Sequence, residues 1–206
     1  MLERPSIGYR LFKRLIDMAG SSLALLLLGP VMLAVAIATW LQDPRAPVLF
    51  RQERAGLGGR PFALLKFRTM VRNADALKEE LRHLSLVPWP DFRLEEDPRV
   101  TRLGRFLRRT SLDELPQLLN VLRGDMSLVG PRPTSFAMDT YDPWQTGRLD
   151  FRPGITGPWQ VRGRTTMDFE ERCRLEIAFF RKPSLWRELA LLIATASAVF
   201  RRTGVA

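Results

Sequence analysis

The feature that most constrains this chain is an apolar run near its N-terminus. From Met18 to Leu41 the 206-residue sequence contains no charged residue. A helix of about 20 apolar residues is enough to cross the hydrocarbon core of a bilayer. A secretory signal peptide has a shorter apolar region, of about 7–15 residues, followed by a small-residue cleavage site. We therefore expect this segment to be retained as a membrane anchor.

Two features of the run favour a re-entrant segment. Gly29-Pro30 lies near its centre, and proline removes a backbone donor and clashes with the preceding turn, so we expect a break there. Both flanks are basic, which the positive-inside rule places on the cytoplasmic side; they contain Arg10, Lys13, Arg14, Arg45, Arg51 and Arg54. A helix broken at Gly29-Pro30 that enters and leaves through one face satisfies both observations. A straight span and a buried soluble helix are the alternatives.

The charge balance points to an anionic partner. The chain carries 32 Lys and Arg against 22 Asp and Glu, a net charge of +10. Such an excess suits anionic lipid, nucleic acid or a phosphorylated substrate, and arginine matches phosphate oxygens in bidentate fashion. The single cysteine, Cys173, and the single histidine, His83, exclude an intrachain disulfide and a Cys/His zinc site. Acid, base or nucleophilic chemistry must therefore fall mainly to carboxylates.

The remaining pattern predicts an α+β fold that is predominantly helical. We expect residues 1–45 to form the membrane re-entrant hairpin with basic flanks, and residues 46–206 to form a cytoplasmic, membrane-associated domain that would carry any catalysis. Within 46–70 two strand-like pieces are divided by Gly56, Gly58 and Gly59, which predicts a small β-hairpin. Loops are expected at 87–98 and 151–165, where proline and glycine gather. Helices, some of them amphipathic and interfacial, are expected at 71–87, 100–109, 112–123, 168–182 and 185–200.

Two adjacent carboxylates occupy a predicted helix start. In Ser111-Leu112-Asp113-Glu114, Ser111 fits the N-cap and Glu114 the third position of a capping box. The positive end of the helix dipole would then favour an ionised Asp113 and a bound phosphate. The simpler alternative is that both acids only cap the helix. Pro116 conflicts with a regular first turn, so the start of this helix is expected to be irregular.

The acids follow a strongly basic stretch. Arg99, Arg102, Arg105 and Arg108 recur every three residues, and at helical spacing they are expected to bring positive charge toward Asp113. Arginine would counter substrate phosphates and keep a nearby aspartate ionised. Two adjacent carboxylates also suit Mg²⁺, which prefers one or two carboxylates together with phosphate oxygens. The residues alone thus predict a membrane-tethered, arginine-rich phosphate site that Mg²⁺ assists.

Three blocks of the sequence resemble one known family. TRLGRFLRRTSLDELPQLLNVLRGDMSLVGPRP (101–133) is similar to the core signature of the bacterial sugar transferases, the monotopic phosphoglycosyl transferases that prime glycan assembly. FRQERAGLGGRPFALLKFRTM (50–70) and RPGITGPWQVRGR (152–164) resemble two further blocks of that family. With the N-terminal apolar run, whose break at Gly29-Pro30 also fits, the resemblance covers nearly the whole chain in the expected order. In extent, the chain resembles the minimal catalytic form of the family.

The resemblance implies a reaction and its partners. Family members transfer a sugar-1-phosphate from a UDP-sugar to a polyprenyl phosphate such as undecaprenyl phosphate, and they release UMP. The mechanism implied is ping-pong, with a covalent aspartyl-phosphosugar intermediate, and it initiates the assembly of exopolysaccharide, O-antigen or glycoconjugate. The implied location is the bacterial inner membrane, with the catalytic domain on the cytoplasmic face. A second copy of the chain, as a homodimer, is a further candidate partner.

The resemblance also carries roles onto particular residues. Asp113 would be the nucleophile, and Glu114 would be a Mg²⁺ ligand beside Asp113 or would assist proton transfer. Phosphate would be bound by Arg108, Arg132, Lys66 and Arg68. Candidates for the nucleotide side are Gly154, Gln160, Arg162 and Arg164. The style of the third block leans toward glucose or galactose as the sugar, without deciding between them.

Two other functions compete with this one. A basic membrane adaptor without catalysis would explain the charge and the apolar run, but not two acids in the most basic stretch. No nucleic-acid motif or interleaved aromatic pattern is present, so nucleic acid is not an expected partner. A phosphohydrolase that uses the same aspartate would pass the intermediate to water. An assay with and without polyprenyl phosphate separates hydrolysis from transfer.

Overall fold

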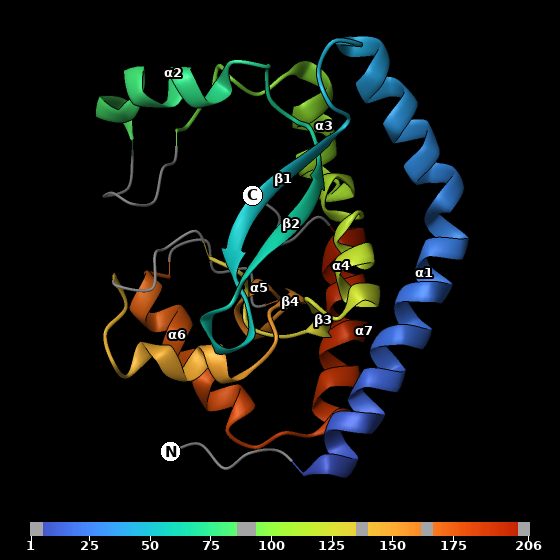
Figure 1. Cartoon of the computed structure of the whole chain (residues 1–206), viewed down its shortest axis with the longest axis vertical. Coiled ribbons are helices and arrows are strands. Elements are labelled where there is room, and N and C mark those ends of the chain that lie inside the picture. Colours follow the sequence, from blue (N-terminus) through green and yellow to red (C-terminus); the bar gives the residue numbers. More distant parts are fainter. Residues whose placement is uncertain (1–5, 86–93, 135–139, 162–166, 202–206) are drawn as a thin grey trace.

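The computed structural model describes residues 6–85, 94–134, 140–161 and 167–201 (Figure 1). It is mixed and predominantly helical, with a long apolar N-terminal helix and a small antiparallel hairpin, as predicted. The elements in chain order are α1 (Ile7–Gln42), β1 (Leu49–Ala55), β2 (Pro61–Phe67), α2 (Ala74–Glu80), α3 (Arg102–Arg109), a 3₁₀ turn (Leu112–Glu114), α4 (Gln117–Arg123), β3 (Ser127–Val129), a 3₁₀ segment (Gln145–Asp150), β4 (Gly154–Thr156), α5 (Pro158–Val161), α6 (Phe169–Phe180) and α7 (Leu185–Arg201).

Helix α1 contains the apolar run and is continuous over 36 residues. Among the described helices it is the one long and apolar enough to cross a membrane. The predicted break at Gly29-Pro30 is not seen, because the helix continues through Pro30. Instead, Figure 1 shows α1 bowed, with its concave side toward the rest of the molecule. A bend is the milder response to proline, which removes one helical hydrogen bond without ending the helix.

The N-terminal end of α1 is bonded to α4 and β3. Arg14 donates to the carbonyls of Val121 and Leu122 at 2.6 and 2.7 Å, and so caps the C-terminal end of α4. The buried Asp17 carboxylate accepts from the hydroxyl of Ser127 at 2.9 Å. Cations at a helix C-terminus and charge-assisted bonds at buried positions are favourable contacts. This end of α1 is therefore held at α4 and β3.

The C-terminal end of α1 is held by the same body. Arg68, directly after β2, donates to the carbonyls of Thr39 and Asp43 at 2.8 and 3.1 Å. In the same half of α1, Val35 packs with Phe67 and Leu107 in one of the buried apolar clusters. Both ends of the apolar helix thus contact one globular unit.

Strands β1 and β2 form the predicted antiparallel hairpin, in which Gln52 pairs with Leu64. The hairpin is joined to α4 by the fully buried Asn120. Its side chain accepts from the amide of Leu65 at 3.0 Å and donates to the carbonyl of Ala63 at 2.8 Å. The Asn120 amide thus bonds backbone groups of β2 as a neighbouring strand would. Because a buried polar group without a partner is costly, these bonds fix β2 against α4.

A second, parallel pair was not predicted. β3 and β4 pair with Ser127 opposite Gly154 and Val129 opposite Thr156. A Cβ on Gly130 would lie 2.2 Å from the carbonyl oxygen of Arg152, and one on Gly154 would lie 2.0 Å from the amide nitrogen of Gly130. Glycine is required at this close backbone contact. The region 151–165, expected to be a loop, therefore contains a strand and the short helix α5.

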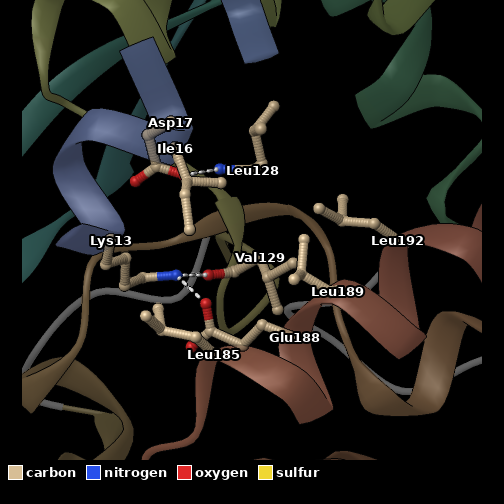
Figure 2. Close-up of a pocket in the computed structure, with 9 residues that line it drawn as sticks. All are labelled: Lys13, Ile16, Asp17, Leu128, Val129, Leu185, Glu188, Leu189 and Leu192. Atoms are coloured by element: carbon tan, nitrogen blue, oxygen red, sulfur yellow. Dashed lines mark hydrogen bonds and ion pairs between the residues drawn. The ribbon is translucent and has the colours of Figure 1, made fainter. Parts of the chain in front are cut away.

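Helix α7 packs against the N-terminal part of α1 across a small pocket (Figure 2). Lys13 forms an ion pair of 2.5 Å with Glu188 on α7 and also donates to the carbonyl of Val129 at 3.0 Å. Tyr9 donates to the same carboxylate. Through these contacts, the N-terminal part of α1 is bonded to both β3 and α7.

Most helix predictions are confirmed, and one helix start is wrong. The stretches expected at 71–87, 100–109, 168–182 and 185–200 contain α2, α3, α6 and α7. In 112–123 the regular helix begins only at Gln117, after a 3₁₀ turn, and ends at Gly124 with φ 93° as a glycine C-cap should. Part of the loop expected at 87–98 lies outside the described residues.

Candidate active site

The two carboxylates lie on a turn with unusual backbone geometry. Ser111 has φ 55°. Among the residues that the structure describes, it is the non-glycine residue whose backbone is left-handed. Its side chain makes no capping hydrogen bond, so the predicted capping box is wrong. Pro116 fits this change, because proline lacks the N–H of an interior helical hydrogen bond and is tolerated at a helix start, and α4 begins one residue later. Left-handed residues of this kind cost free energy and cluster at functional sites.

Asp113 is buried, with 7% of its surface exposed. Burial raises the pKa of its carboxyl group, while the positive charge of Lys66 opposes that shift most strongly among its neighbours. Within the described part of the chain, no group donates a hydrogen bond to this carboxylate. Its oxygens are therefore left available for a substrate phosphorus or a metal ion.

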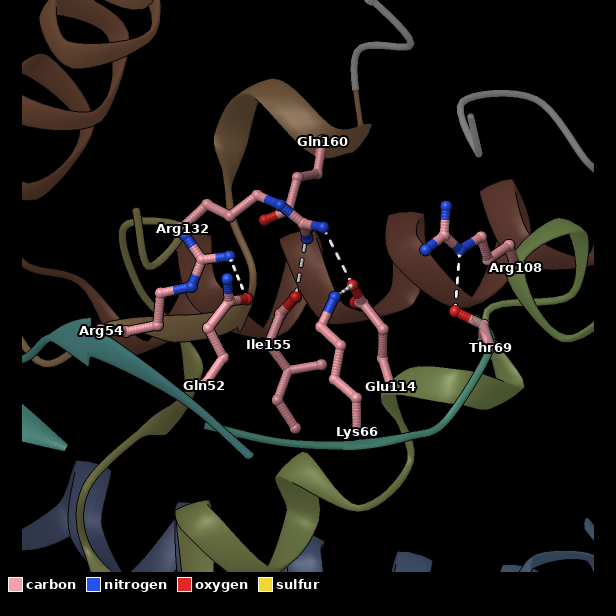
Figure 3. A network of polar contacts seen from close by, with 9 residues as sticks. All are labelled: Gln52, Arg54, Lys66, Thr69, Arg108, Glu114, Arg132, Ile155 and Gln160. Atoms are coloured by element: carbon pink, nitrogen blue, oxygen red, sulfur yellow. Dashed lines mark hydrogen bonds and ion pairs between the residues drawn. The ribbon is translucent and has the colours of Figure 1, made fainter. Parts of the chain in front are cut away.

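Glu114 has the opposite environment. Its Oε1 atom accepts from Lys66 Nζ and from Arg132 Nη2, both at 2.9 Å (Figure 3). Burial alone would raise the pKa of Glu114, but the charges and hydrogen bonds of Arg132 and Lys66 lower it to about 2. Glu114 is therefore ionised at neutral pH and holds two cations beside Asp113. We call Lys66, Glu114 and Arg132 the Glu114 cluster.

The cations of this cluster come from distant parts of the chain. Lys66 lies on β2, which Asn120 fixes against α4. Arg132 follows β3 in the segment Gly130-Pro131-Arg132-Pro133, which is held against β4 by the bond from the Gly154 amide to the carbonyl of Pro131, at 2.9 Å. The structure thus brings Lys66 and Arg132 together with the adjacent Asp113 and Glu114.

Arg108 approaches the same site from α3. Its Nε donates to the hydroxyl of Thr69 at 3.0 Å, as Figure 3 shows. Burial lowers the pKa of Arg108, and the negative charge of Asp113 opposes that shift. An arginine always remains charged at neutral pH, so Arg108 adds a third cation to this region.

The other predicted cations lie elsewhere. Arg68 donates to carbonyls at the end of α1 and is not part of the Glu114 cluster. Arg99 is buried in a 2.7 Å ion pair with Asp97, before α3 begins. The remaining α3 arginines are exposed, namely Arg102, Arg105 and Arg109. The regular spacing distributes the arginines of α3 around the helix. Of the four, only Arg108 faces the carboxylates.

Of the four residues predicted to lie on the nucleotide side, the structure describes Gly154 and Gln160. Gly154 lies in β4 and permits its close approach to Gly130. Gln160 lies on α5 with its side chain beside Arg132 in Figure 3. Its Nε2 donates to the carbonyl of Ile155 at 3.2 Å, and its buried Oε1 has no partner among the described residues. Arg162 and Arg164 lie outside the described residues.

Sequence reasoning missed a buried polar centre behind Arg132. Glu176 on α6 is fully buried and pairs with Arg148, and Trp159 also donates to it. The available signal was a glutamate among the apolar positions of the amphipathic stretch 168–182. Neither Arg148 nor Trp159 carried a pattern that distinguished it from a surface residue.

The donor set for Mg²⁺ is small. The described residues contain no group of three or more His, Cys, Asp or Glu side chains that could hold a metal ion. Asp113 and Glu114 supply two carboxylates, and Oε1 of Glu114 already receives two cations. One or two carboxylates beside cations for phosphate fit the way Mg²⁺ is bound with substrate phosphates.

Comparison with known proteins places this site in a family. Residues 8–202 match the model of the bacterial sugar transferases. A galactosyl transferase, CpsE, of Streptococcus agalactiae is 40% identical over 194 residues, which is 93% of this chain and 43% of that protein. An undecaprenyl-phosphate galactose phosphotransferase of Salmonella typhimurium is 42% identical over 202 residues, 95% of this chain and 42% of that protein.

A shorter relative is covered more completely. A UDP-glucose:undecaprenyl-phosphate glucose-1-phosphate transferase of Caulobacter vibrioides is 43% identical over 202 residues, 93% of this chain and 70% of that protein. The chain spans less than half the length of the first two relatives. The family match extends from α1 to α7 and includes the Glu114 cluster. The chain belongs to the bacterial sugar transferase family.

Proposed function

We propose that this chain transfers a sugar-1-phosphate from a UDP-sugar to a polyprenyl phosphate and releases UMP. The observation that carries the proposal is a buried aspartate, Asp113, free of hydrogen bonds from the described residues and adjacent to a carboxylate that holds two cations. The family match supports it, as do relatives named for transfer of galactose or glucose phosphate to undecaprenyl phosphate. UDP-galactose and UDP-glucose are therefore the first donors to test.

In the first step, an oxygen of the Asp113 carboxylate attacks the phosphorus next to the sugar. An O–P bond forms, and the bond from this phosphorus to the oxygen shared with UMP breaks, so that UMP leaves with the electron pair. Carboxylate nucleophiles form acyl phosphates in this way in other phosphoryl transfers. Lys66, Arg108 and Arg132 offset the negative charge of the diphosphate, and fixed charges of this kind stabilise developing charge strongly in a partly dry site.

In the second step, an oxygen of the polyprenyl phosphate attacks the same phosphorus. The bond to Asp113 breaks, the free carboxylate returns, and a polyprenyl diphosphate sugar is formed. Glu114 holds Lys66 and Arg132 in place through both steps. Asp113 and Glu114 would also hold Mg²⁺, which would supply charge neutralisation on the phosphate oxygens.

We further propose that α1 is re-entrant. The described globular unit contacts α1 through Arg14 and Asp17 at one end and through Arg68 at the other. A straight span would place these ends on opposite sides of about 30 Å of hydrocarbon, which one polar unit cannot cross. The ends therefore share one face, which the basic flanks assign to the cytoplasmic side of the bacterial inner membrane.

Labelling of single cysteines tests this topology. Gly8 and Arg45 are exposed near the two ends of α1, and the native Cys173 is buried, so background labelling is low. Gly8→Cys and Arg45→Cys should both react with a membrane-impermeant maleimide only in inverted vesicles. Reaction of the two positions from opposite sides would overturn the re-entrant arrangement.

The reaction is tested with purified full-length chain, undecaprenyl phosphate and either UDP-galactose or UDP-glucose. We expect UMP release that requires the lipid at multiple turnover, and a covalently labelled protein when a donor with a radiolabelled sugar is supplied alone. Sustained UMP release without the lipid would instead indicate a phosphohydrolase. Label that persists in Asp113→Asn would remove Asp113 as the nucleophile.

A further inference from the structure

A buried carboxylate on α6 bonds to the backbone of Arg132, a member of the Glu114 cluster. Glu176 on α6 is fully buried, and every described group that bonds to it is a donor. Its Oε1 accepts from the amide of Arg132 at 2.8 Å and from Trp159 Nε1 at 3.0 Å. Its Oε2 accepts from Arg148 Nε at 2.9 Å and pairs with Arg148 Nη2 at 2.6 Å. A carboxylate surrounded only by donors is suited to the ionised form.

Arg148, the partner of Glu176, also bonds to the backbone of Arg132. Its Nη2 donates to the carbonyl oxygen of Arg132 at 2.7 Å. The backbone N–H and C=O of Arg132 are thus both bonded to the Glu176–Arg148 pair. Because Arg132 sits between Pro131 and Pro133, its backbone has few alternative conformations. Its guanidinium then extends to Glu114 at 2.9 Å.

The same pair orients a second group near the site. The Trp159 ring lies 5.9 Å from the guanidinium carbon of Arg132. Its indole N–H is held by Glu176, so the direction of the ring is set by the carboxylate that also holds the Arg132 amide. The pair therefore links α6, the segment Gln145–Asp150 and α5 to one arginine of the Glu114 cluster.

Stability alone gives a poor account of this arrangement. The cost of desolvating a buried ion pair can exceed its attraction, and apolar residues of similar volume often stabilise a protein as well or better. Burial raises the pKa of the Glu176 carboxyl group, because desolvation disfavours its charged form. What an apolar replacement would not provide is the set of directed bonds to Arg132 and Trp159.

We propose that Glu176 and Arg148 are positioning residues, which hold Arg132 and Trp159 so that the Arg132 guanidinium meets the diphosphate of the donor. The proposal rests on the proposed function, because it assigns Arg132 to the phosphates of a UDP-sugar. Glu176 and Arg148 act through Arg132 and do not touch the reacting atoms.

The first test is a double-mutant cycle in the full chain, with UMP release from UDP-galactose or UDP-glucose as the assay. Glu176→Gln places an amide nitrogen against donors, and we expect a loss of about tenfold to a hundredfold in kcat/KM for the donor, as for other supporting residues. In the Arg132→Ala background the same change should add little, because the guanidinium it positions is gone. Fully additive losses would overturn the proposal.

A second variant separates positioning from folding. Glu176→Leu with Arg148→Met removes both charges and should recover much of the thermal stability that either single change loses. Activity should remain low, since the bonds to Arg132 are not restored. Recovery of activity together with Tm would show that the pair is only structural. Glu188→Gln is the matched control, because this buried carboxylate on α7 forms its ion pair with Lys13 on α1.

Hydrogen–deuterium exchange gives a readout that does not need turnover. We expect faster exchange of the Arg132 amide in Glu176→Gln, but not in Glu188→Gln, with the rest of the protein unchanged. Unchanged exchange at Arg132 would overturn the positioning role even in an active enzyme. If the wild-type chain released no UMP, the proposed function would fail while the exchange result still decided whether Glu176 holds Arg132.

Discussion

Two basic regions of the molecule differ in what surrounds their charges. The outer face of α3 carries Arg102, Arg105 and Arg109 in solvent. In the Glu114 cluster, Lys66 and Arg132 meet one partly buried carboxylate, each at 2.9 Å. The first region has three cations within one helix, and the second collects its cations from two distant segments.

The difference shows that burial and convergence matter more than the number of charges. Exposed charges are screened by water and salt over about 8–10 Å. Charges in a poorly solvated site interact several times more strongly at the same distance. The Glu114 cluster shifts the pKa of Glu114 to about 2. We therefore expect perturbations of the cluster to affect the reaction, and perturbations of the α3 face to leave the chemistry intact.

The largest effect should follow loss of the nucleophile. Asp113→Asn keeps the shape of the side chain but cannot form the acyl phosphate, so we expect kcat to fall by roughly three orders of magnitude or more. UMP release at multiple turnover measures the change. Asp150→Asn, at an exposed carboxylate, is the control and should behave as wild type. Retained turnover in Asp113→Asn would move the chemistry to another residue.

Removing one cation of the Glu114 cluster should have the next largest effect. Lys66→Met keeps the aliphatic stem, and we expect kcat/KM to fall by about a hundredfold, as when one charge-stabilising donor is lost. The charge of Lys66 lowers the pKa of Asp113, so its removal raises that pKa. Because Asp113 must be ionised to attack, the acid limb of the pH–rate profile should move to higher pH. An unmoved limb would mean that Lys66 does not act on Asp113.

Glu114 should also contribute to stability in a pH-dependent way. Its folded pKa of about 2 lies below the usual value of a glutamate. The stabilisation is therefore present above the unfolded pKa, near pH 4–5, and is lost as the pH falls through the folded pKa. At about 1.4 kcal/mol for each pKa unit, the contribution is about 3 kcal/mol. The Tm difference between wild type and Glu114→Gln should shrink between about pH 5 and pH 2; a constant difference would contradict the ion pairs.

The smallest effect is expected on the α3 face. Replacing Arg102, Arg105 and Arg109 together by glutamine removes three exposed charges, and each such surface change is worth little. We expect kcat in detergent to stay within about twofold of wild type. Arg108→Gln is the matched comparison on the same helix and should reduce kcat/KM clearly more. Equal losses in the two variants would erase the distinction between the two regions.

Local patterns predicted much of the architecture and the identity of the acids. The hairpin followed from alternating runs divided by Gly56, Gly58 and Gly59, and α3 followed from its helical pattern. Asp113 and Glu114 were found as an adjacent pair at a predicted helix start, and the resemblance to the family implied the role of each. The helix start at Ser111 was wrong, because Pro116 and a left-handed Ser111 turn the chain before α4 begins.

Contacts between residues far apart in the chain could not be predicted from local patterns. Arg68 was assigned to phosphate from its place in a family block, but the structure directs it to the end of α1. Glu176 gave no signal beyond a charge on an apolar face, although it bonds Arg132, 44 positions away. The direction of a long side chain depends on which partners the fold places within its reach.

By itself, the sequence determined that the chain has an apolar membrane segment, a hairpin, basic helices and an Asp-Glu pair, because each of these depends on residues that are neighbours in the chain. Only the tertiary structure decided which cations serve that pair. Lys66 and Arg132 reach Glu114 because Asn120 fixes β2 against α4 and the β3–β4 pair holds the segment around Arg132. The physical reason is that charges act strongly only where folding brings them together away from water.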